Sequence, residues 1–492
     1  MRMNERRMKT LEDYLRQDAE SYPDKVAVIC RDEACTYRQL WARVEARAAT
    51  LCAERTAATP YWEENQLLGQ LISFPTTQSI DFLVEYFAIH LAGAVAVPLE
   101  KSLYDSMKET TDSSLENLMS GNSQVVPQGV ADVLFTTGTT GKSKGVMISH
   151  STIIANAENL MAAQGFHHDL TFVITGPLNH IGSLSKVYPM ILVGGTLHIL
   201  EGMKDLDAFF KVMEPSGSNE KMSAIDGNPR FATFLVPASI RMLLTFAADR
   251  LAHCADRIEF IETGAAPISQ ADMQRLCEVL PKSRLFNTYA STETGIISTY
   301  DFNHGECVAG CLGKPMKHSH FFLVDEEGEK VQEDAAMGKV ACSGKTLMAG
   351  YYGDEALTKS ILREGIIYIN DLAEIDADGN LHLKGRDGDV INVGGYKVSP
   401  TEVENAALAI PGVKDCICIP VQHRVLGTVL KLLVVLQEGF SFDKRQLALG
   451  LREKLEAHKV PMQYEQVDAI HRTFNGKLNR KAYLTTEKDA QG

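Results

Sequence analysis

The chain has 492 residues, of which 45% are hydrophobic and 23% are charged, and its formal net charge at pH 7 is −14. A chain of this length is expected to form about two to four domains, and its composition excludes a largely disordered or low-complexity protein. Its negative charge repels polyanions, so we expect no nucleic acid among its partners.

The N-terminal segment, MRMNERRMKT, is basic but no apolar run follows it, so no signal peptide is expected. The ten cysteines show no spacing typical of a zinc or redox motif. Cys416 and Cys418 alternate onto one face of the strand-like run CICIP, which predicts reduced thiols packed in or near a core. These features favour a cytoplasmic location.

The first elements alternate between strand and helix. Residues 24–51 predict a strand, a turn, a short second strand and a helix, and residues 67–100 predict strand, helix, strand. This order favours a mostly parallel sheet covered by helices. The most apolar stretch, 82–99, is interrupted by charged and polar residues, so we expect a buried helix and strand and no membrane span. Residues 104–130 are polar and predict a surface connection with at most one short helix.

The pattern changes in the second half of the chain. Strand and helix signals continue from 131 to about 300, whereas residues 310–385 contain short strands separated by Gly and Asp turns. That pattern predicts antiparallel hairpins in a small barrel-like sheet. From about 388 onward a helix, two apolar strands and a second helix predict a separate small α+β unit.

A glycine-rich loop, TTGTTGKSKG (136–145), follows the predicted strand ADVLF. Its Gly-Lys-Ser is how a Walker loop ends, but Thr136 stands where that loop needs its first glycine, so a P-loop hydrolase is excluded. Glycines let the backbone approach a phosphate, threonine hydroxyls can donate to its oxygens, and Lys142 and Lys144 supply positive charge. The loop therefore predicts phosphate binding, with a flexible polar turn as the alternative.

The loop resembles the Thr-Ser-Gly-Thr-Thr-Gly-x-Pro-Lys-Gly motif of the adenylate-forming superfamily, which contains acyl-CoA synthetases, adenylation domains and luciferases. Thr137 and Ser143 are the two differences. Further motifs of the family follow in order over nearly the whole chain. The resemblance implies that Thr140 helps to bind Mg²⁺ and that the following residues contact ATP: Thr136, Thr137, Gly138, Thr139, Thr140, Gly141, Lys142 and Lys144.

Three motifs in the middle of the chain carry the resemblance further. GPLNHIGSL (176–184) is similar to the acyl-pocket segment and makes His180 a catalytic candidate, although a histidine beside apolar residues is as often structural. ETGAAPIS (262–269) is similar to the segment that lies against adenine and the acyl group, through Gly264, Ala265, Ala266 and Pro267. NTYASTETG (287–295) implies that Tyr289 stacks on adenine, Thr292 bonds the α-phosphate and Glu293 binds Mg²⁺.

The longest match, residues 368–404, implies that Asp371 accepts both ribose hydroxyls and that Arg386 contacts the ribose and phosphate region. The family has Thr-Gly before that Asp, whereas Ile369 and Asn370 stand here, so we expect a different local turn. Gly388 falls at the family's hinge position. Gly394 and Gly395 match the loop that approaches the pantetheine thiol of coenzyme A.

The last motif, RTFNGKLNRKAY (472–483), makes Lys477 the implied catalytic lysine. The resemblance implies an α/β fold with two doubly wound α/β subdomains and a small β-barrel-like subdomain in a large N-terminal domain, 1–386. A hinge near 387–388 and a small mobile α+β domain, 389–492, would follow. We expect a monomer or a homodimer.

The implied reaction activates a carboxylic acid with ATP and Mg²⁺ to an acyl-adenylate, which is then transferred to coenzyme A. Ile181 follows His180 where amino-acid-activating relatives carry an Asp, which favours an acyl or aryl acid, as in fatty acid metabolism. Transfer to the phosphopantetheine thiol of an acyl carrier protein is the first alternative. A nucleotide-binding scaffold without catalytic activity is the second.

Overall fold

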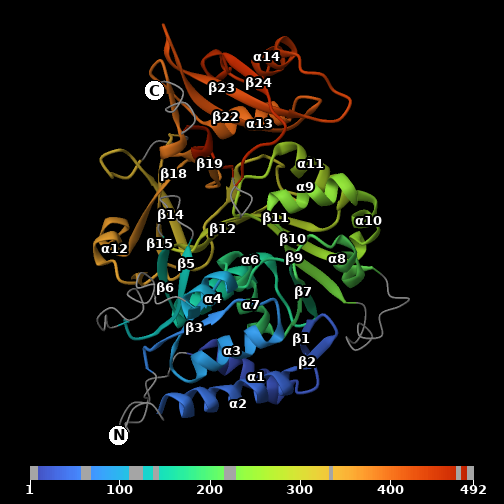
Figure 1. The fold of residues 1–492 in the computed structure, drawn as a ribbon, viewed down its shortest axis with the longest axis vertical. Coiled ribbons are helices and arrows are strands. Elements are labelled where there is room, and N and C mark those ends of the chain that lie inside the picture. The colour runs from blue at the N-terminus through green and yellow to red at the C-terminus, as the bar shows by residue number, and fades with distance from the viewer. Residues whose placement is uncertain are drawn as a thin grey trace.

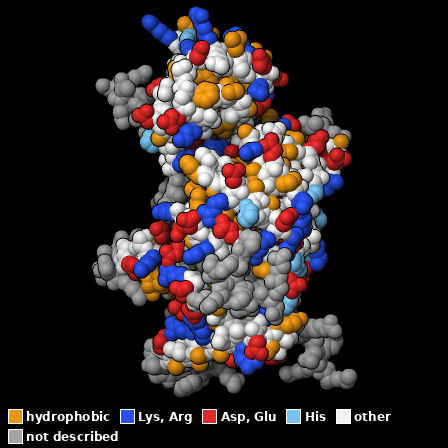
Figure 2. All heavy atoms as spheres, turned by 90° about the vertical axis from the view of Figure 1, so that its right-hand side faces the viewer, with side chains coloured by type: hydrophobic (Ala, Val, Ile, Leu, Met, Phe, Trp, Pro, Cys, Tyr) orange, Lys and Arg blue, Asp and Glu red, His pale blue; other side chains and the backbone are white. Residues whose placement is uncertain are grey.

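The computed structural model describes residues 9–56, 68–109, 126–136, 143–214, 229–331, 336–472 and 478–484. Two mixed sheets form the N-terminal part, a six-stranded antiparallel sheet lies beside them, and the C-terminal elements form a separate lobe (Figure 1). In Figure 2 the surface narrows between this upper lobe and the body of the molecule. The predicted α/β class is confirmed.

The largest sheet has eight strands in the order β12-β11-β10-β9-β7-β8-β1-β2. Its six inner strands run parallel, and only the edge strands β2 and β12 are antiparallel to their neighbours. β1, β7 and β8 are buried along their whole length, as expected for parallel strands covered on both faces. The strands are β1 (Val26–Cys30), β2 (Glu33–Thr36), β7 (Leu170–Ile174), β8 (Thr196–Ile199), β9 (Arg230–Phe234), β10 (Ile258–Thr263), β11 (Arg284–Ser291) and β12 (Gly295–Asp301).

Serine and glycine residues mark the ends of several helices around this sheet. Ser149 accepts a hydrogen bond from the Thr152 amide at the start of α6, and Gly165, with φ of 70°, ends that helix. The helices are α1 (Leu11–Ser21), α2 (Tyr37–Thr56), α6 (His150–Gln164), α7 (Ile181–Val193), α8 (Leu206–Met213), α9 (Pro237–Phe246), α10 (Ala248–His253), η2 (Ala255–Arg257) and α11 (Gln270–Val279).

The second sheet has the order β16-β6-β5-β4-β3, with β3 (Leu71–Pro75), β4 (Val95–Leu99), β5 (Val130–Thr136), β6 (Lys144–Ser149) and β16 (Gly350–Tyr351). The stretch 82–99 contains most of the buried helix α3 (Ile80–Leu91), a short turn and the buried strand β4, as predicted. Across the described ranges, no helix has the length and apolar character needed to cross a membrane. Helix α4 (Lys101–Glu109) opens the predicted connection 104–130, of which 110–125 lie outside the described residues.

The third sheet is antiparallel, in the order β13-β19-β18-β15-β14, with β17 beside β18. The predicted Gly and Asp turns join its strands: Asp376 accepts hydrogen bonds from the amides of Asp378 and Asn380. Its elements are β13 (Cys311–Gly313), β14 (Ser319–Val324), β15 (Gly338–Gly344), α12 (Glu355–Ile361), β17 (Leu362–Arg363), β18 (Ile366–Ile375) and β19 (Leu381–Arg386).

The C-terminal lobe packs helices against a three-stranded sheet, in the order β22-β23-β24. Cys416 and Cys418 on β22 are free thiols buried in its apolar core, as predicted. The predicted hinge residues 387–388 lie in η3 (Asp387–Asp389). The other elements are β20 (Ile391–Val393), β21 (Tyr396–Val398), α13 (Pro400–Leu408), β22 (Val413–His423), β23 (Gly427–Leu436), α14 (Lys444–Arg452), η4 (Ala457–Lys459), β24 (Gln463–Gln466) and α15 (Lys481–Leu484).

A buried charged cluster joins α1, α3 and β5. The two ring nitrogens of His90 lie 2.9 Å from Glu12 Oε1 and 2.9 Å from Asp132 Oδ1, and Tyr86 donates its hydroxyl to Asp132. The His150 ring packs against His90. Burial alone would lower the pKa of His90, but the two carboxylates outweigh it and raise the pKa to about 10. His90 is therefore a buried imidazolium at neutral pH.

This cluster makes stability depend on pH. The folded-state pKa of His90 lies above its unfolded value of about 6.5, so its stabilisation is complete below that pH and is lost as pH rises through about 10. Between pH 7 and 10 we expect the melting temperature of the wild-type protein to fall more steeply than that of His90→Gln. At pH 7, the free energy of unfolding of His90→Gln should be about 3 kcal/mol lower than that of wild type, because two carboxylates stay buried without their cation. If the melting temperatures of the two proteins fall equally between pH 7 and 10, the raised pKa of His90 is contradicted.

Candidate active site

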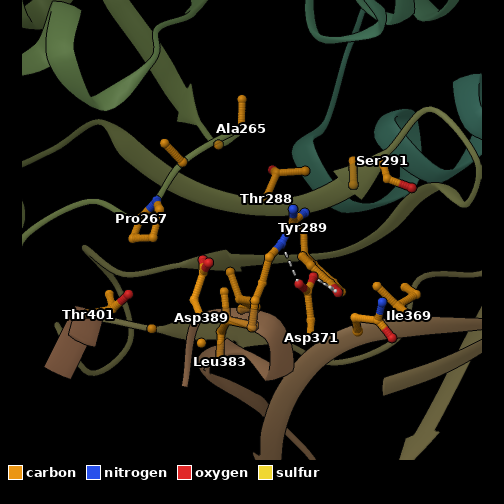
Figure 3. Close-up of a pocket in the computed structure, with 18 of the residues that line it drawn as sticks. Ala265, Pro267, Thr288, Tyr289, Ser291, Ile369, Asp371, Leu383, Asp389 and Thr401 are labelled. Carbon is orange, nitrogen blue, oxygen red and sulfur yellow. Dashed lines mark hydrogen bonds and ion pairs between the residues drawn. The ribbon is translucent and has the colours of Figure 1, made fainter. Parts of the chain in front are cut away.

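A cavity of about 2480 Å³ lies where the eight-stranded sheet, the six-stranded sheet and the C-terminal lobe meet. It opens at the carboxyl ends of parallel strands β9 and β10, the edge of an open α/β sheet where ligands usually bind. Figure 3 shows residues that line it: Ala265 and Pro267 lie on one side, whereas Asp371, Leu383 and Asp389 lie on the other.

The predicted segment Gly264, Ala265, Ala266 and Pro267 follows β10 directly and lines this cavity. Gly264 is buried, and a Cβ there would lie 2.7 Å from the Thr288 carbonyl oxygen, so only glycine allows this approach to β11. Ala265 has φ of 64°, which is unusual for a residue other than glycine. The turn therefore holds exposed backbone at the cavity wall, where a flat ligand can lie against it.

Tyr289, Asp371 and Arg386 meet in this cavity, although the first and last are 97 positions apart: Tyr289 lies on β11 beside the turn and reaches across to β18 and β19. Asp371 accepts a hydrogen bond from the Tyr289 hydroxyl at 2.6 Å and one from Arg386 Nε at 2.9 Å (Figure 3). Burial and the Asp371 charge raise the pKa of Tyr289 well above its usual value, so the phenol stays protonated as a donor. The backbone at Asp371 forms no turn: strand β18 runs through it and pairs Asp371 with Arg386 on β19.

Thr292 and Glu293 lie in the turn that follows β11 and line the same cavity. Glu293 Oε1 accepts a hydrogen bond from the Tyr351 hydroxyl at 2.9 Å. Lys144, at the start of β6, places its ammonium 5.5 Å from the centre of the Tyr351 ring. A carboxylate fixed by one oxygen beside a hydroxyl donor and a cation fits the oxygen ligation that Mg²⁺ requires and the charge of a phosphate.

The glycine-rich loop joins β5 to β6, and Thr136 pairs with Lys144 across this hairpin. A Walker loop leads from a strand into a helix, whereas a strand follows the loop here. This topology also excludes a Walker loop. Of the predicted phosphate contacts, Thr136 and Lys144 line the cavity. The remaining ones lie outside the described residues: Thr137, Gly138, Thr139, Thr140, Gly141 and Lys142.

His180 is the N-cap of α7, where its Nδ1 accepts a hydrogen bond from the Gly182 amide at 3.1 Å. Its side chain lines the cavity together with Ile181. His180 thus has a structural role, capping α7, which the sequence left open beside a catalytic one. The cap hydrogen bond holds its imidazole ring at the cavity wall.

Residues from the C-terminal lobe close the cavity on one side. Lys477 lies outside the described residues, but Arg472 and Leu478, on either side of the undescribed segment, both line the cavity. Arg472 pairs with Asp415, which lies 3.9 Å from Arg241 on α9. Gly394 and Gly395 instead form the exposed turn between β20 and β21. Positive φ angles of 58° and 96° favour glycine at both positions.

Sequence reasoning missed two contacts at this site. Tyr351, the partner of Glu293, lies in a two-residue strand that has no motif of its own. Lys186 and Glu262 form a buried ion pair at the cavity wall with an Nζ–Oε1 distance of 2.8 Å. Charged residues inside otherwise apolar helix and strand patterns were the signals that could have revealed this pair.

Comparison with known proteins is consistent with this geometry. The AMP-binding enzyme family model matches residues 101–352, and the model for the C-terminal domain of AMP-binding enzymes matches residues 402–477. A feruloyl-CoA synthase from an Amycolatopsis species is 30% identical over 363 residues, covering 72% of this chain and 70% of that protein. The putative long chain fatty acid-CoA ligase VraA of Staphylococcus epidermidis is 26% identical over 491 residues, covering 96% and 98%.

Solved structures share the fold. ATP-bound MatB from Rhodopseudomonas palustris superposes with a TM-score of 0.82 at 23% identity, covering 98% of this chain and all of that one. The Bacillus subtilis o-succinylbenzoate CoA synthetase MenE, solved with ATP and magnesium ion, has a TM-score of 0.77 at 22% identity, covering 95% and 98%.

Proposed function

The chain belongs to the AMP-binding enzyme family, and from this membership we propose that it is an AMP-forming acid–CoA ligase. It activates a carboxylic acid with ATP, releases pyrophosphate, and transfers the acyl group from the adenylate to the thiol of coenzyme A. The curated relatives include CoA synthases and ligases for aryl and long-chain acids. Because Ile181 offers no charge for a substrate ammonium, the substrate is an acyl or aryl acid without an α-amino group.

The observation that carries this proposal is the single cavity that gathers the Gly264–Pro267 turn, Tyr289, Glu293, Asp371 and Arg386. We assign nucleoside binding to the turn and to the Asp371 group, because a carboxylate can accept two ribose hydroxyls and an exposed backbone turn can lie against a base. Glu293 would hold Mg²⁺, and Thr292 would donate to the α-phosphate. When bound, Mg²⁺ supplies positive charge that offsets the charge developing on the phosphate oxygens.

In the first half-reaction a carboxylate oxygen of the acid attacks the α-phosphorus of ATP. The bond from this phosphorus to the oxygen that bridges the α- and β-phosphates breaks, and pyrophosphate leaves. Lys477 would donate to the carboxylate and α-phosphate oxygens. In the second, the thiol sulfur of coenzyme A attacks the acyl carbon, AMP leaves, and the thiol proton is lost. The turn at Gly394 and Gly395 would then lie against the pantetheine arm.

We propose that the chain divides into domains 1–386 and 389–492, and that the smaller domain rotates about Gly388 between the half-reactions. A Cβ on Gly388 would have no heavy atom within 4 Å, so steric crowding does not demand glycine in the present arrangement. Freedom of the backbone during the rotation is a reason for glycine at this position.

The test is carboxylate-dependent exchange of labelled pyrophosphate into ATP, measured with the full chain, Mg²⁺ and a broad panel of acyl and aryl acids. We expect exchange with some acids, followed by thioester formation when coenzyme A is added. Absence of exchange across the panel would refute the proposal. If a thioester forms only with a phosphopantetheinylated carrier protein, then the carrier protein and not coenzyme A is the acceptor.

A further inference from the structure

A buried ion pair between α7 and β10 forms part of the cavity wall. Lys186 lies on the inner face of α7, and Glu262 lies near the carboxyl end of β10. Both residues are 1% exposed. Lys186 Nζ donates to Glu262 Oε1 at 2.8 Å. Both residues line the cavity, and Glu262 comes directly before the turn marked by Ala265 and Pro267 in Figure 3.

The pair leaves hydrogen-bonding capacity unused. Glu262 Oε2 is buried and has no hydrogen-bond partner among the residues that the structure describes. The Lys186 ammonium has three N–H donors; one serves Glu262, and the group lies 5.3 Å from the centre of the Phe234 ring. A buried acceptor without a partner costs about 1–3 kcal/mol. A ligand that supplies the missing donor would recover that free energy.

Stability alone is a weak reason for this pair. Two charges lose their hydration when they are buried, and apolar side chains of similar volume are often at least as stabilising. The Phe234 ring lies beside Lys186, so apolar side chains in place of the pair would have an apolar neighbour. Burial accordingly lowers the pKa of Lys186 despite the nearby Glu262 charge. A polar pair at a cavity wall is better explained by recognition of a ligand.

The charges of the pair limit what the ligand group can be. The pair is net neutral, so a second carboxylate or an ammonium on the substrate is attracted by one member and repelled by the other, and either group must also lose its hydration to be buried there. A hydroxyl is neutral, can donate to Glu262 Oε2 and can accept from Lys186 Nζ at the same time. We propose that Lys186 and Glu262 recognise a hydroxyl group on the acyl or aryl part of the acid, so that the protein activates hydroxylated carboxylic acids. This inference rests on the proposed acid-activating function.

The experiment compares kcat/KM in pyrophosphate exchange for matched acids that carry a hydroxyl, a hydrogen, an amine or a second carboxylate at the same position. The hydroxyl is moved stepwise away from the reacting carboxylate along alkyl and phenyl series. Because a site built to bind a hydroxyl rejects the analogue that lacks it, the best hydroxylated acid should exceed its unsubstituted analogue about 100-fold or more. In the double variant Lys186→Met/Glu262→Leu, this ratio should fall to about threefold or less, or reverse.

Arg47 and Glu85 provide a matched control, because they form an ion pair that does not line the cavity. The variant Arg47→Met/Glu85→Leu should keep the wild-type ratio. If Lys186→Met/Glu262→Leu does not fold, Glu262→Gln keeps the shape of the side chain and should still lower the ratio about tenfold by removing the charged acceptor.

Exchange that is equally fast or faster with the unsubstituted, amino or dicarboxylic acid would overturn this inference and leave the proposed function intact. A hydroxyl preference that survives in the Lys186/Glu262 double variant would also overturn the role of the pair. Absence of exchange with every acid would overturn the proposed function itself, and the inference with it.

Discussion

Lys477→Ala should lower the rate of acyl-adenylate formation about 100-fold or more and leave thioester formation from supplied acyl-adenylate within about threefold of wild type. In the proposed mechanism this ammonium offsets charge only while the α-phosphorus is attacked. Once the small domain has rotated, the same lysine is withdrawn and the Gly394–Gly395 turn is near the thiol. One side chain cannot serve both arrangements, so the loss of Lys477 should slow the first half-reaction and leave the second nearly unchanged.

Single-turnover measurements of each half-reaction check this result. Lys414→Ala is the matched control, because Lys414 is exposed on β22 of the same lobe and does not line the cavity. Equal losses in the two half-reactions would contradict the role assigned to Lys477, and so would unchanged adenylation.

Asp371→Ala should lower kcat/KM for ATP about 100-fold or more, chiefly through a higher KM. The carboxylate holds the Tyr289 hydroxyl and Arg386 Nε, and in the proposed complex it also accepts ribose hydroxyls. Two hydrogen bonds to a charged group contribute about 3 kcal/mol or more together, and about 1.4 kcal/mol corresponds to tenfold. Arg386 would also lose the partner that holds it at the cavity wall.

Steady-state kinetics with ATP as the varied substrate measure this effect. Asp378→Asn is the control, because Asp378 lies in an exposed turn of the same sheet and outside the cavity. A KM for ATP that stays at the wild-type value in Asp371→Ala would refute ribose binding by this carboxylate.

Much of the local structure was predictable because short-range chemistry sets it. The apolar stretch 82–99 became α3 and β4, and the Gly and Asp turns of 310–385 joined antiparallel strands. The missing glycine at Thr136 excluded the Walker loop, and the hairpin of β5 and β6 gives the same answer from topology. At Asp371 the residues before it predicted only a difference from the family's local turn, and the pairing of β18 with β19 determines an extended backbone there.

By itself, the sequence determined the order of strands and helices, the membership of the family and the residue types that nucleotide and metal chemistry require. Only the tertiary structure decided which of those side chains meet. Tyr351 reaches Glu293 across 58 residues, because β16 pairs with β6 and the nearby Met348 amide donates to the Glu293 carbonyl oxygen. Lys186 reaches Glu262 across 76 residues, from helix α7 to strand β10. Local patterns report the periodicity of a segment but not its neighbours, since strand order depends on how all the apolar faces are buried together.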